Sequence, residues 1–551
     1  MISNALEMFG SLLGPSGVVV DPEELNYFVT DMSGPGDFLP ICVLRPIAVE
    51  QLSQAITISS GLGLPIIPRG SGASYSRGYI PDYDSFVMID MSLLNKIEDI
   101  NEQDMHVTVQ AGCTWGELSG SLKKKGLRVP FGGPLILGKS TIGGAISSNP
   151  ESFSSAHYGS LSDSILGLEV ILADGTLLET GSASAEGRNS FTRSFGPDWT
   201  GPFVGDCGAF GIKVRITLRL INISPNQEYI SFLFDTIEDL TEAHIALSHE
   251  NVVTEQWGFD PLGFDSVVNQ ELKVLNTSHS FVSGFEHIEL DNLDTEKINN
   301  KVLTDGQRLS DRSGYSLHAV IDGVNQQDCL DKVKVVRRIC QPISIKELSG
   351  DITKSTRFRS FAPVQSLLGP SGEVCLPVHG MFPLSRAAEV AAVTDEYFIR
   401  HLELLEAFNI KVAYFTAIYS GAFVIEPVFY WHDRLHALHL RHVSALQKEK
   451  YGENKPNPEA RAAVFQLRLD LSGLWDTFGA VHYQIGRDYS YSGQLSSSAL
   501  KLAKAFKSVV DPNGLMNPGV LGLSAADDVI ANTTNFPEFP QDLLRDWRNA
   551  I

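Results

Sequence analysis

The chain has 551 residues, too many for a single hydrophobic core, so two or more domains are expected. Its 43% apolar and 20% charged residues are ordinary for a globular protein. Forty-three Lys and Arg stand against 65 Asp and Glu, and the net charge of −22 argues against nucleic acid and anionic lipid as partners. The 6 cysteines form no CxxC pair, no stretch approaches the roughly 20 apolar residues of a membrane span, and no basic region precedes the first apolar stretch. We therefore expect a cytoplasmic protein.

The first part of the chain alternates predicted strands and helices. A strand is expected over residues 42–46, an amphipathic helix over 49–61 and a buried strand over 64–68. The last strand runs directly into the loop Arg69-Gly70-Ser71-Gly72-Ala73-Ser74-Tyr75. A strand followed by a glycine-rich loop is what backbone N–H recognition of a pyrophosphate requires. The loop has no GxGxxG pattern and opens no helix, so it is not the Rossmann fingerprint.

A second stretch of small residues follows further along the chain. Thr114 and Glu117 form a capping-box pattern that predicts the start of a helix. From residue 138 to residue 148 small side chains dominate, so the backbone there can lie directly against a bulky ligand. An apolar run over 165–173 then ends at Asp174-Gly175, a turn typical of paired strands. These features favour a large, flat, phosphate-bearing cofactor.

The order of these motifs is distinctive. Between residues 68 and 212 the chain reads PRGSGAS, AGCTWGEL, STIGGAISSN, HYGSLSDSILGLEVILADG and GPFVGDCGAFGI, with other residues between them. This order resembles the FAD-binding domain of the vanillyl-alcohol oxidase and p-cresol methylhydroxylase flavoprotein superfamily. The resemblance implies an FAD site with contacts from Arg69, Gly70, Ser71, Gly72, Ala73, Ser74, Tyr75, Pro134, Ser140, Thr141, Gly143, Gly144, Ser147, Gly159, Ile165, Gly211, Ile212 and Asn517.

The chain departs from the family pattern at two places. Many members carry Asn-Ala-Gly-Gly where this chain has Asn149-Pro150-Glu151-Ser152, so the local loop is expected to differ. The first glycine loop contains no histidine, which excludes histidine attachment of the flavin there and leaves attachment from a second domain open.

The family implies an α+β fold. A PCMH-type FAD-binding domain of two α/β subdomains would carry an antiparallel-sheet cap that covers the flavin and selects the substrate. After residue 222, strand-like runs alternate with predicted helices, among them 237–250, 385–407 and 434–449, and this alternation favours such a sheet. We predict an N-terminal FAD-binding part over 1–222, a cap domain over 223–470 and a C-terminal segment over 471–551 that returns to the FAD-binding domain.

Candidate active-site residues in the cap carry weaker signals. Arg357 and Arg359 would share one face of a strand and could bind a carboxylate, although two exposed arginines on an edge strand are at least as consistent with the pattern. His379 lies between a predicted strand and a turn, a position suited to a pocket. Glu426 and Tyr430 would share a strand face that forms either a substrate wall or part of the cap core.

Histidines recur at a fixed spacing on one predicted helix of the cap. His436, His439 and His442 stand at positions i, i+3 and i+6, a spacing that could hold a metal. A solvated helical face is the favoured interpretation, and no metal site is predicted.

The C-terminal segment resembles members that oxidise D-2-hydroxy acids. The segment Ala480-Val481-His482-Tyr483 precedes a helix and then DPNGLMNPG over 511–519. The resemblance places His482 beside the flavin as the base that takes a hydroxyl proton, a task suited to its pKa. Tyr483 and Arg487 would orient the substrate. The glutamate and paired histidines that bind a metal in such members are missing here.

We therefore predict an FAD-dependent oxidoreductase that transfers hydride from a small alcohol or 2-hydroxy acid to flavin N5. Dioxygen or a separate electron-acceptor protein would re-oxidise the flavin, and a homodimer is an open alternative. A second enzyme is an alternative, a para-hydroxyphenyl oxidase of 4-alkylphenols or benzylic alcohols. Tyr430 and Tyr483, together with Arg487, favour it. A flavoprotein subunit of a cytochrome-linked dehydrogenase is the third alternative.

Overall fold

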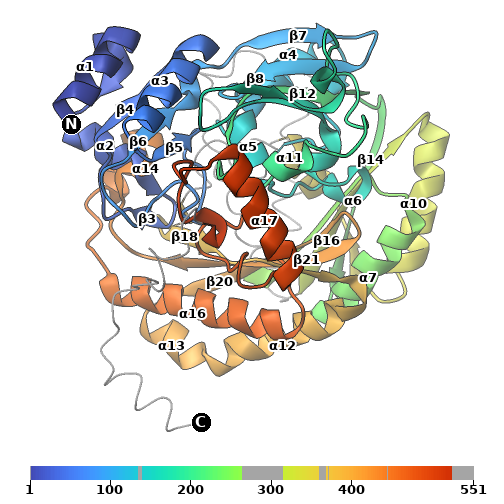
Figure 1. Cartoon of the computed structure of the whole chain (residues 1–551). Coiled ribbons are helices and arrows are strands. Elements are labelled where there is room, and N and C mark those ends of the chain that lie inside the picture. The colour runs from blue at the N-terminus through green and yellow to red at the C-terminus, as the bar shows by residue number, and fades with distance from the viewer. Residues whose placement is uncertain are drawn as a thin grey trace.

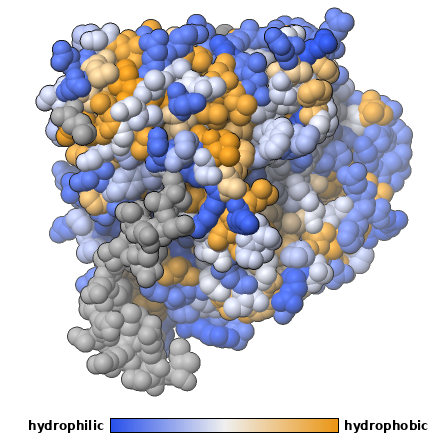
Figure 2. Space-filling view, viewed as in Figure 1, coloured by the Kyte–Doolittle hydropathy of each residue, from blue (hydrophilic) through white to orange (hydrophobic). Residues whose placement is uncertain are grey.

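The computed structural model describes residues 2–133, 139–262, 314–358, 368–369, 371–443 and 445–523. In Figure 1 the N-terminal elements occupy the upper half of the view, and a large sheet with its helices occupies the lower half. The hydrophilic residues that dominate the surface over the lower elements in Figure 2 agree with the acidic composition, while apolar residues gather over the N-terminal elements at the upper left. Of the helices within these ranges, none is long and apolar enough to cross a membrane.

The N-terminal part contains two main sheets. The first is a mixed sheet in the order β1 (Val18–Val19), β4 (Cys42–Leu44), β6 (Val87–Asp90), β5 (Ile66–Arg69). The second is antiparallel, in the order β11 (Leu177–Glu179), β10 (Ile165–Ile171), β12 (Ile212–Arg219), β8 (His106–Gln110), β7 (Ile97–Asn101). The helices of the N-terminal part are α1 (Ile2–Leu13), α2 (Pro22–Phe28), α3 (Val49–Gly61), α4 (Trp115–Lys123), α5 (Ile142–Ser148) and α6 (Ser155–Tyr158).

Local sequence signals explain several of these boundaries. The Thr114 hydroxyl accepts from the Glu117 N–H at 3.2 Å and the Glu117 carboxylate accepts from the Thr114 N–H at 3.0 Å, so the predicted capping box starts α4. The predicted turn at Asp174-Gly175 joins β10 to its antiparallel partner β11, with Gly175 at φ +88°. The small residues of the second glycine-rich stretch form the short helix α5, which Thr141 caps by accepting from the Gly144 N–H.

The cap is built on one eight-stranded antiparallel sheet, called the cap sheet below. Its order is β17 (Lys346–Leu348), β14 (Asn226–Phe234), β16 (Tyr315–Gly323), β15 (Glu255–Phe259), β20 (Lys411–Tyr419), β21 (Ala422–Trp431), β18 (Val374–Pro377), with β19 (Gly380–Pro383) also paired to β21. Its helices are α7 (Ile237–Glu250), α10 (Gln326–Cys340), α11 (Asp351–Phe358), α12 (Ala387–Arg400), α13 (Leu402–Ala407), α14 (Ala437–His442), α15 (Ala445–Tyr451) and α16 (Pro458–Thr477). Helices α12, α13 and α16 run beneath this sheet in Figure 1.

One predicted cap helix, over residues 385–407, is two helices in the structure. The break between α12 and α13 falls at His401, whose ring Nδ1 lies 2.8 Å from the Tyr397 carbonyl oxygen. Such a side-chain bond to the backbone competes with helix continuation. The predicted helix over 434–449 is likewise divided, into α14 and α15.

The C-terminal segment returns to the N-terminal part. The Ile66 N–H of β5 donates to the Leu515 carbonyl at 2.7 Å, and the Asn517 N–H donates to the Ile66 carbonyl at 2.9 Å. Helix α17 (Ser497–Val510) carries Phe506, whose ring lies 5.7 Å from that of Phe203. Residues far apart in the sequence therefore complete one edge of the first sheet.

Candidate active site

A cavity lies where the N-terminal part meets the cap sheet. The space between its walls, open solvent at its mouth included, is about 1280 Å³. Half of the residues in its wall are ones expected to bind FAD: Arg69, Gly70, Ser71, Gly72, Ala73, Ser74, Tyr75, Ser140, Thr141, Gly143, Gly144, Ser147, Gly211 and Ile212. The remaining lining includes Glu151, Glu426 and Gln484.

The two glycine-rich stretches lie against each other, because their glycines leave no side chain between them. A Cβ on Gly70 would lie 2.2 Å from the Thr141 hydroxyl oxygen. A Cβ on Gly143 would lie 2.6 Å from the Ala111 Cβ, and the Gly143 N–H donates to the Ala111 carbonyl at 2.8 Å. The cavity wall here is therefore largely backbone and small side chains, which suits a flat cofactor with a phosphate-bearing chain.

Arg69 stands directly behind the first loop. Its guanidinium lies 4.6 Å from the Tyr27 ring centre and 5.0 Å from that of Phe28, and Nη1 donates to the Gly70 carbonyl at 3.2 Å. Gly72 has φ +82°, and a Cβ there would lie 2.3 Å from Arg69 Nη2. The buried Nε and Nη2 atoms have no hydrogen-bond partner. A fixed positive charge beneath a loop of backbone N–H groups fits the pyrophosphate of FAD.

Three residues expected to contact FAD do not line the cavity. Gly159 ends α6 at φ +83°, and Ile165 begins β10 with 1% of its surface exposed. The Asn517 side-chain amide donates to the Gly78 carbonyl at 2.8 Å and to the Cys207 carbonyl at 2.6 Å. These residues hold the surrounding backbone. Pro134, also expected at the cofactor, lies outside the described residues.

Glu151 and Glu426, called the acidic pair below, line the cavity where the cap sheet meets it. The Tyr483 hydroxyl donates to Glu426 Oε2 at 2.7 Å. Glu151 is 3% exposed, and neither of its carboxylate oxygens makes a well-formed hydrogen bond, although the Tyr483 phenol lies close enough to oppose the rise in its pKa. A buried carboxyl group without a well-formed hydrogen bond is costly unless it is neutral or a ligand bonds to it.

Burial controls the protonation of this pair. It raises the pKa of Glu426 to about 7, against the opposing effect of the hydrogen bond from Tyr483. Burial and, after it, the nearby charge of Glu426 hold the pKa of Glu151 well above its usual range. At neutral pH Glu151 therefore keeps its proton, while Glu426 exchanges its proton with a small change in pH.

An aromatic layer positions the Tyr483 phenol. Its ring stacks on His379, with ring centres 3.8 Å apart, and faces Tyr419 at 5.8 Å. His379 is fully buried and is bonded to the Tyr483 carbonyl through Nε2 at 2.5 Å, while Nδ1 lies 3.3 Å from the Tyr75 hydroxyl and 3.2 Å from that of Tyr489. Burial lowers the pKa of His379 well below its usual range, so this ring is neutral. It touches two tyrosines of the site but does not line the cavity.

His482, the expected base, is also absent from the cavity wall. Its Nδ1 lies 2.8 Å from the His379 carbonyl oxygen and its Nε2 lies 3.3 Å from Asp476 Oδ1. Successive side chains of an extended segment point to opposite sides. Because Tyr483 points toward Glu426, its neighbour His482 points away.

Arg487 and Tyr430, two further expected site residues, have structural surroundings. Arg487 donates to the carbonyls of Arg77 and Gly78 and, through Nη2, to Asn517 Oδ1 at 2.9 Å and the Pro518 carbonyl at 2.8 Å. It thereby ties two backbone segments together. Tyr430 lies on β21 and packs against the cap core, and neither residue lines the cavity.

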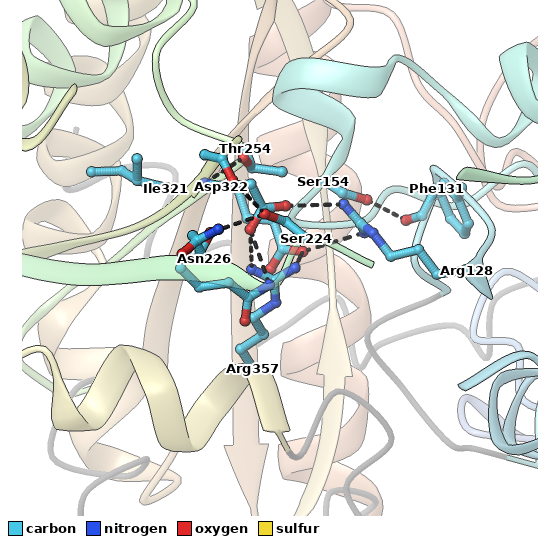
Figure 3. Close-up of polar contacts among 12 residues, drawn as sticks. Arg128, Phe131, Ser154, Ser224, Asn226, Thr254, Ile321, Asp322 and Arg357 are labelled. Carbon is cyan, nitrogen blue, oxygen red and sulfur yellow. Dashed lines mark hydrogen bonds and ion pairs between the residues drawn. The ribbon is translucent and has the colours of Figure 1, made fainter. Parts of the chain in front are cut away.

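Arg357 belongs to helix α11, not to the predicted strand, and its charge is already paired. Figure 3 shows it in a group of charged residues at the junction of the N-terminal part and the cap. Its guanidinium lies 3.3 Å from Glu255 and 3.4 Å from Asp322, and Arg128 approaches the same two carboxylates at 3.7 and 3.6 Å. These four residues, called the charge quartet below, are at most 15% exposed. Arg359 lies outside the described residues.

The histidines of α14 do not form a solvated face, contrary to expectation. His439 is fully buried, and burial lowers the pKa of His436 to about 4. The helix packs against α2 and β2 (Thr30–Asp31), which covers its histidine side. Within the part of the chain that the structure describes, no group of three or more His, Cys, Asp or Glu residues could hold a metal ion.

No motif in the sequence predicts the acidic pair. The sequence pattern places Glu426 on a strand face that forms either a substrate wall or part of the cap core, and Glu426 is the one charged residue in the apolar strand AFVIEPVFYW. Glu151 falls in the segment that departs from the family pattern. A lone acid within an apolar strand is a usable signal of a functional carboxyl group, because such burial is costly.

Comparisons with known proteins support an FAD-binding domain in the N-terminal part. The FAD binding domain family matches residues 40–181. The glycolate oxidase subunit GlcD of Bacillus subtilis is 31% identical over 200 residues, which cover 36% of this chain and 41% of that protein. A probable D-2-hydroxyglutarate dehydrogenase of Oryza sativa is 30% identical over 216 residues, which cover 39% of this chain and 37% of that protein. The matches thus span less than half the length of these relatives.

Solved structures match over nearly the whole chain. A structure of p-cresol methylhydroxylase with substrate bound aligns with a TM-score of 0.69 and 17% identity, covering 96% of this chain and 98% of that one. The 4-ethylphenol oxidase of Gulosibacter chungangensis aligns with a TM-score of 0.71 and 17% identity, covering 94% and 97%. At this identity the matches show the fold, and they confirm the predicted combination of an FAD-binding part with an antiparallel-sheet cap.

Proposed function

We propose that this chain, whose residues 40–181 form an FAD binding domain within the vanillyl-alcohol oxidase and p-cresol methylhydroxylase fold, oxidises a carbon that bears a hydroxyl group. Distant relatives named as glycolate oxidase, D-2-hydroxyglutarate dehydrogenase and D-lactate dehydrogenase support this reaction type. FAD supplies the hydride acceptor when bound. Dioxygen or a separate electron-acceptor protein would complete the cycle.

One observation carries the proposal. The same cavity that is walled by the cofactor loops also exposes the acidic pair, Glu151 and Glu426. Oxidation of an alcohol removes a hydride from carbon and a proton from oxygen, so a proton acceptor must stand beside the cofactor. A carboxylate with a pKa of about 7 is well matched to accept that proton near neutral pH.

The residues of the site divide this work. Glu426 accepts the hydroxyl proton as the carbonyl of the product forms. Tyr483, bonded to Glu426 at 2.7 Å, keeps the carboxylate in place and favours its ionised form. Glu151, which retains its proton, can donate a hydrogen bond to the substrate oxygen. His379 and His482 act as positioning residues behind Tyr483.

The proposal is tested by mixing the purified, FAD-loaded protein anaerobically with alcohols and hydroxy acids and recording loss of the oxidised flavin absorbance. Glu426→Gln should retain FAD and slow reduction by roughly 10²–10⁴-fold, the range of general-base losses. His482→Ala, as the matched comparison, should slow reduction far less. The reverse ranking would return the base role to His482, and an unreduced flavin with every compound would reject the oxidoreductase.

A second substrate class has support because a tyrosine lines the same cavity as the acidic pair. Tyr75 is part of the cavity wall, and the Gln484 side chain donates to its hydroxyl at 3.2 Å. An aromatic side chain in the wall suits an aromatic substrate ring. Including 4-hydroxybenzyl alcohol among the compounds above separates a para-hydroxyphenyl oxidase from an aliphatic alcohol oxidase.

A further inference from the structure

Positive charge in the cavity is confined to the cofactor end. Among the described residues that line the cavity, only Arg69 and Lys213 are cationic. The Arg69 guanidinium lies behind the first loop, beneath Gly72. Lys213 forms a buried ion pair with Asp206. Both cations belong to the wall that FAD would cover.

Three other arginines that could supply a positive charge are engaged elsewhere. Arg468 Nε donates to the Pro377 carbonyl at 2.8 Å, and its Nη1 lies 3.4 Å from Asp488. Arg487 donates to four acceptors of its own surroundings. Arg357, a candidate carboxylate binder from its sequence, belongs to the charge quartet. In the described part of the chain, no lining cation stands beside Glu151 and Glu426.

The polar groups at this end match hydroxyl groups instead. Glu426 offers acceptor oxygens, protonated Glu151 offers one donor and further acceptor capacity, and Gln484 offers an amide. A hydroxyl both donates and accepts, so it can satisfy these groups in pairs. A carboxylate can only accept, and beside ionised Glu426 it would meet a like charge in a buried site.

From this arrangement we infer that the substrate presents an uncharged, hydroxyl-bearing group to the acidic pair, and that a carboxylate adjacent to the reacting carbon is disfavoured. This inference rests on the proposed function and narrows its substrate class to uncharged alcohols. A carboxylate could bind there only if Glu426 also took up a proton, because Glu151 already carries one.

The test compares compounds that differ only in this charge. Lactamide against lactate and mandelamide against mandelate share a carbinol carbon, and benzamide against benzoate gives a pair that cannot be oxidised. Binding of each to the FAD-loaded protein is measured at pH 8 from the change in the flavin spectrum and from the unfolding midpoint. Each amide should bind more tightly than its acid by about tenfold or more, since one buried like charge is worth at least that ratio.

Two isosteric variants locate the cause. Glu426→Gln removes the ionised carboxylate, so the preference for benzamide over benzoate should fall by about tenfold. Glu151→Gln replaces a group that is already neutral, so the preference should persist. Equal loss in both variants, or no loss in either, would contradict the assignment.

Outcomes for binding and for flavin reduction are separable. If the amides bind more tightly but no compound reduces the flavin, the charge preference stands and the proposed oxidation fails. If acids bind as tightly as amides, or no uncharged compound binds, the inference is overturned even where an alcohol reduces the flavin.

Discussion

The two ends of the cavity are built by different means. At the cofactor end the wall is backbone and small side chains from two glycine-rich stretches, residues 69–75 and 140–147. At the substrate end the wall includes polar side chains brought together from separate segments, namely Glu151, Glu426 and Gln484. A cofactor held by backbone requires local glycine patterns, whereas a substrate held by side chains requires only that distant positions converge. The first construction is visible in a sequence and the second is not.

The largest loss of stability is expected at the charge quartet, which lies outside both ends of the cavity. Arg357→Met should leave Glu255 and Asp322 with only Arg128 and should lower the free energy of unfolding by about 3 kcal/mol, as for a buried pair that loses one partner. Chemical denaturation measures this loss. Flavin reduction should be unchanged if the quartet is purely structural, and a specific loss of turnover with hydroxy acids would contradict that assignment.

A matched surface pair provides the control for that experiment. Arg337 lies 2.8 Å from Glu347 with 45% and 30% of the two side chains exposed. Arg337→Met should cost less than about 1 kcal/mol, because exposed pairs contribute little. Similar losses at both arginines would show that the quartet is no more than a surface pair.

At the cofactor end, Gly143→Ala should weaken FAD binding. The added methyl would lie 2.6 Å from Ala111 Cβ and 3.0 Å from its carbonyl oxygen, so α5 must shift. Overpacking of this kind costs about 1–3 kcal/mol, which corresponds to a loss of roughly 10–100-fold in FAD affinity. Gly120→Ala in α4, where a Cβ meets nothing within 4 Å, is the control and should retain FAD. Fluorescence titration of the apoprotein with FAD measures both.

At the substrate end, the rate of flavin reduction should depend on pH through Glu426. The base works only when ionised, so the rate should rise as pH increases through about 7 and then level off. Tyr483→Phe removes the hydrogen bond that lowers the pKa of Glu426, so the rise should move to higher pH. The control is Tyr430→Phe, which removes a phenol from β21, the strand that carries Glu426. Tyr430 does not line the cavity, so this change should leave the pH profile where it is. Anaerobic stopped-flow absorbance measures these pH profiles. A profile that Tyr483→Phe leaves unchanged would show that Glu426 is not the group whose ionisation controls the rate.

Much of the fold was predictable because its signals are local. The capping box at Thr114, the turn at Asp174-Gly175 and the helix over 237–250 depend on neighbouring residues, and the structure has each of them. The fold class followed from the order of the FAD motifs. The cavity wall formed by Arg69 to Tyr75 depends on the missing side chain of Gly70 and the positive φ of Gly72, and a sequence displays both glycines.

The substrate end was not predictable to the same degree. Sequence spacing indicates that His482 and Tyr483 point in opposite directions in an extended segment, but not which of them reaches the acidic pair. That choice depends on Glu426, which belongs to a different part of the chain. Likewise, Arg357 has the chemistry of a carboxylate binder, and only the positions of Glu255 and Asp322 reveal that its charge is already paired.

The return of the C-terminal segment to β5 has a consequence for the order of events on the ribosome. The Ile66 N–H and carbonyl bond to Leu515 and Asn517. The carbonyls of Gly78 and Cys207 accept from the Asn517 side-chain amide. All of the cap sheet is synthesised before residue 515 emerges. The cofactor-binding part therefore stays open along one edge of its first sheet until the cap sheet has been made. FAD is thus expected to be captured late, after translation, and a nascent chain stalled before this segment should carry a folded cap and little flavin.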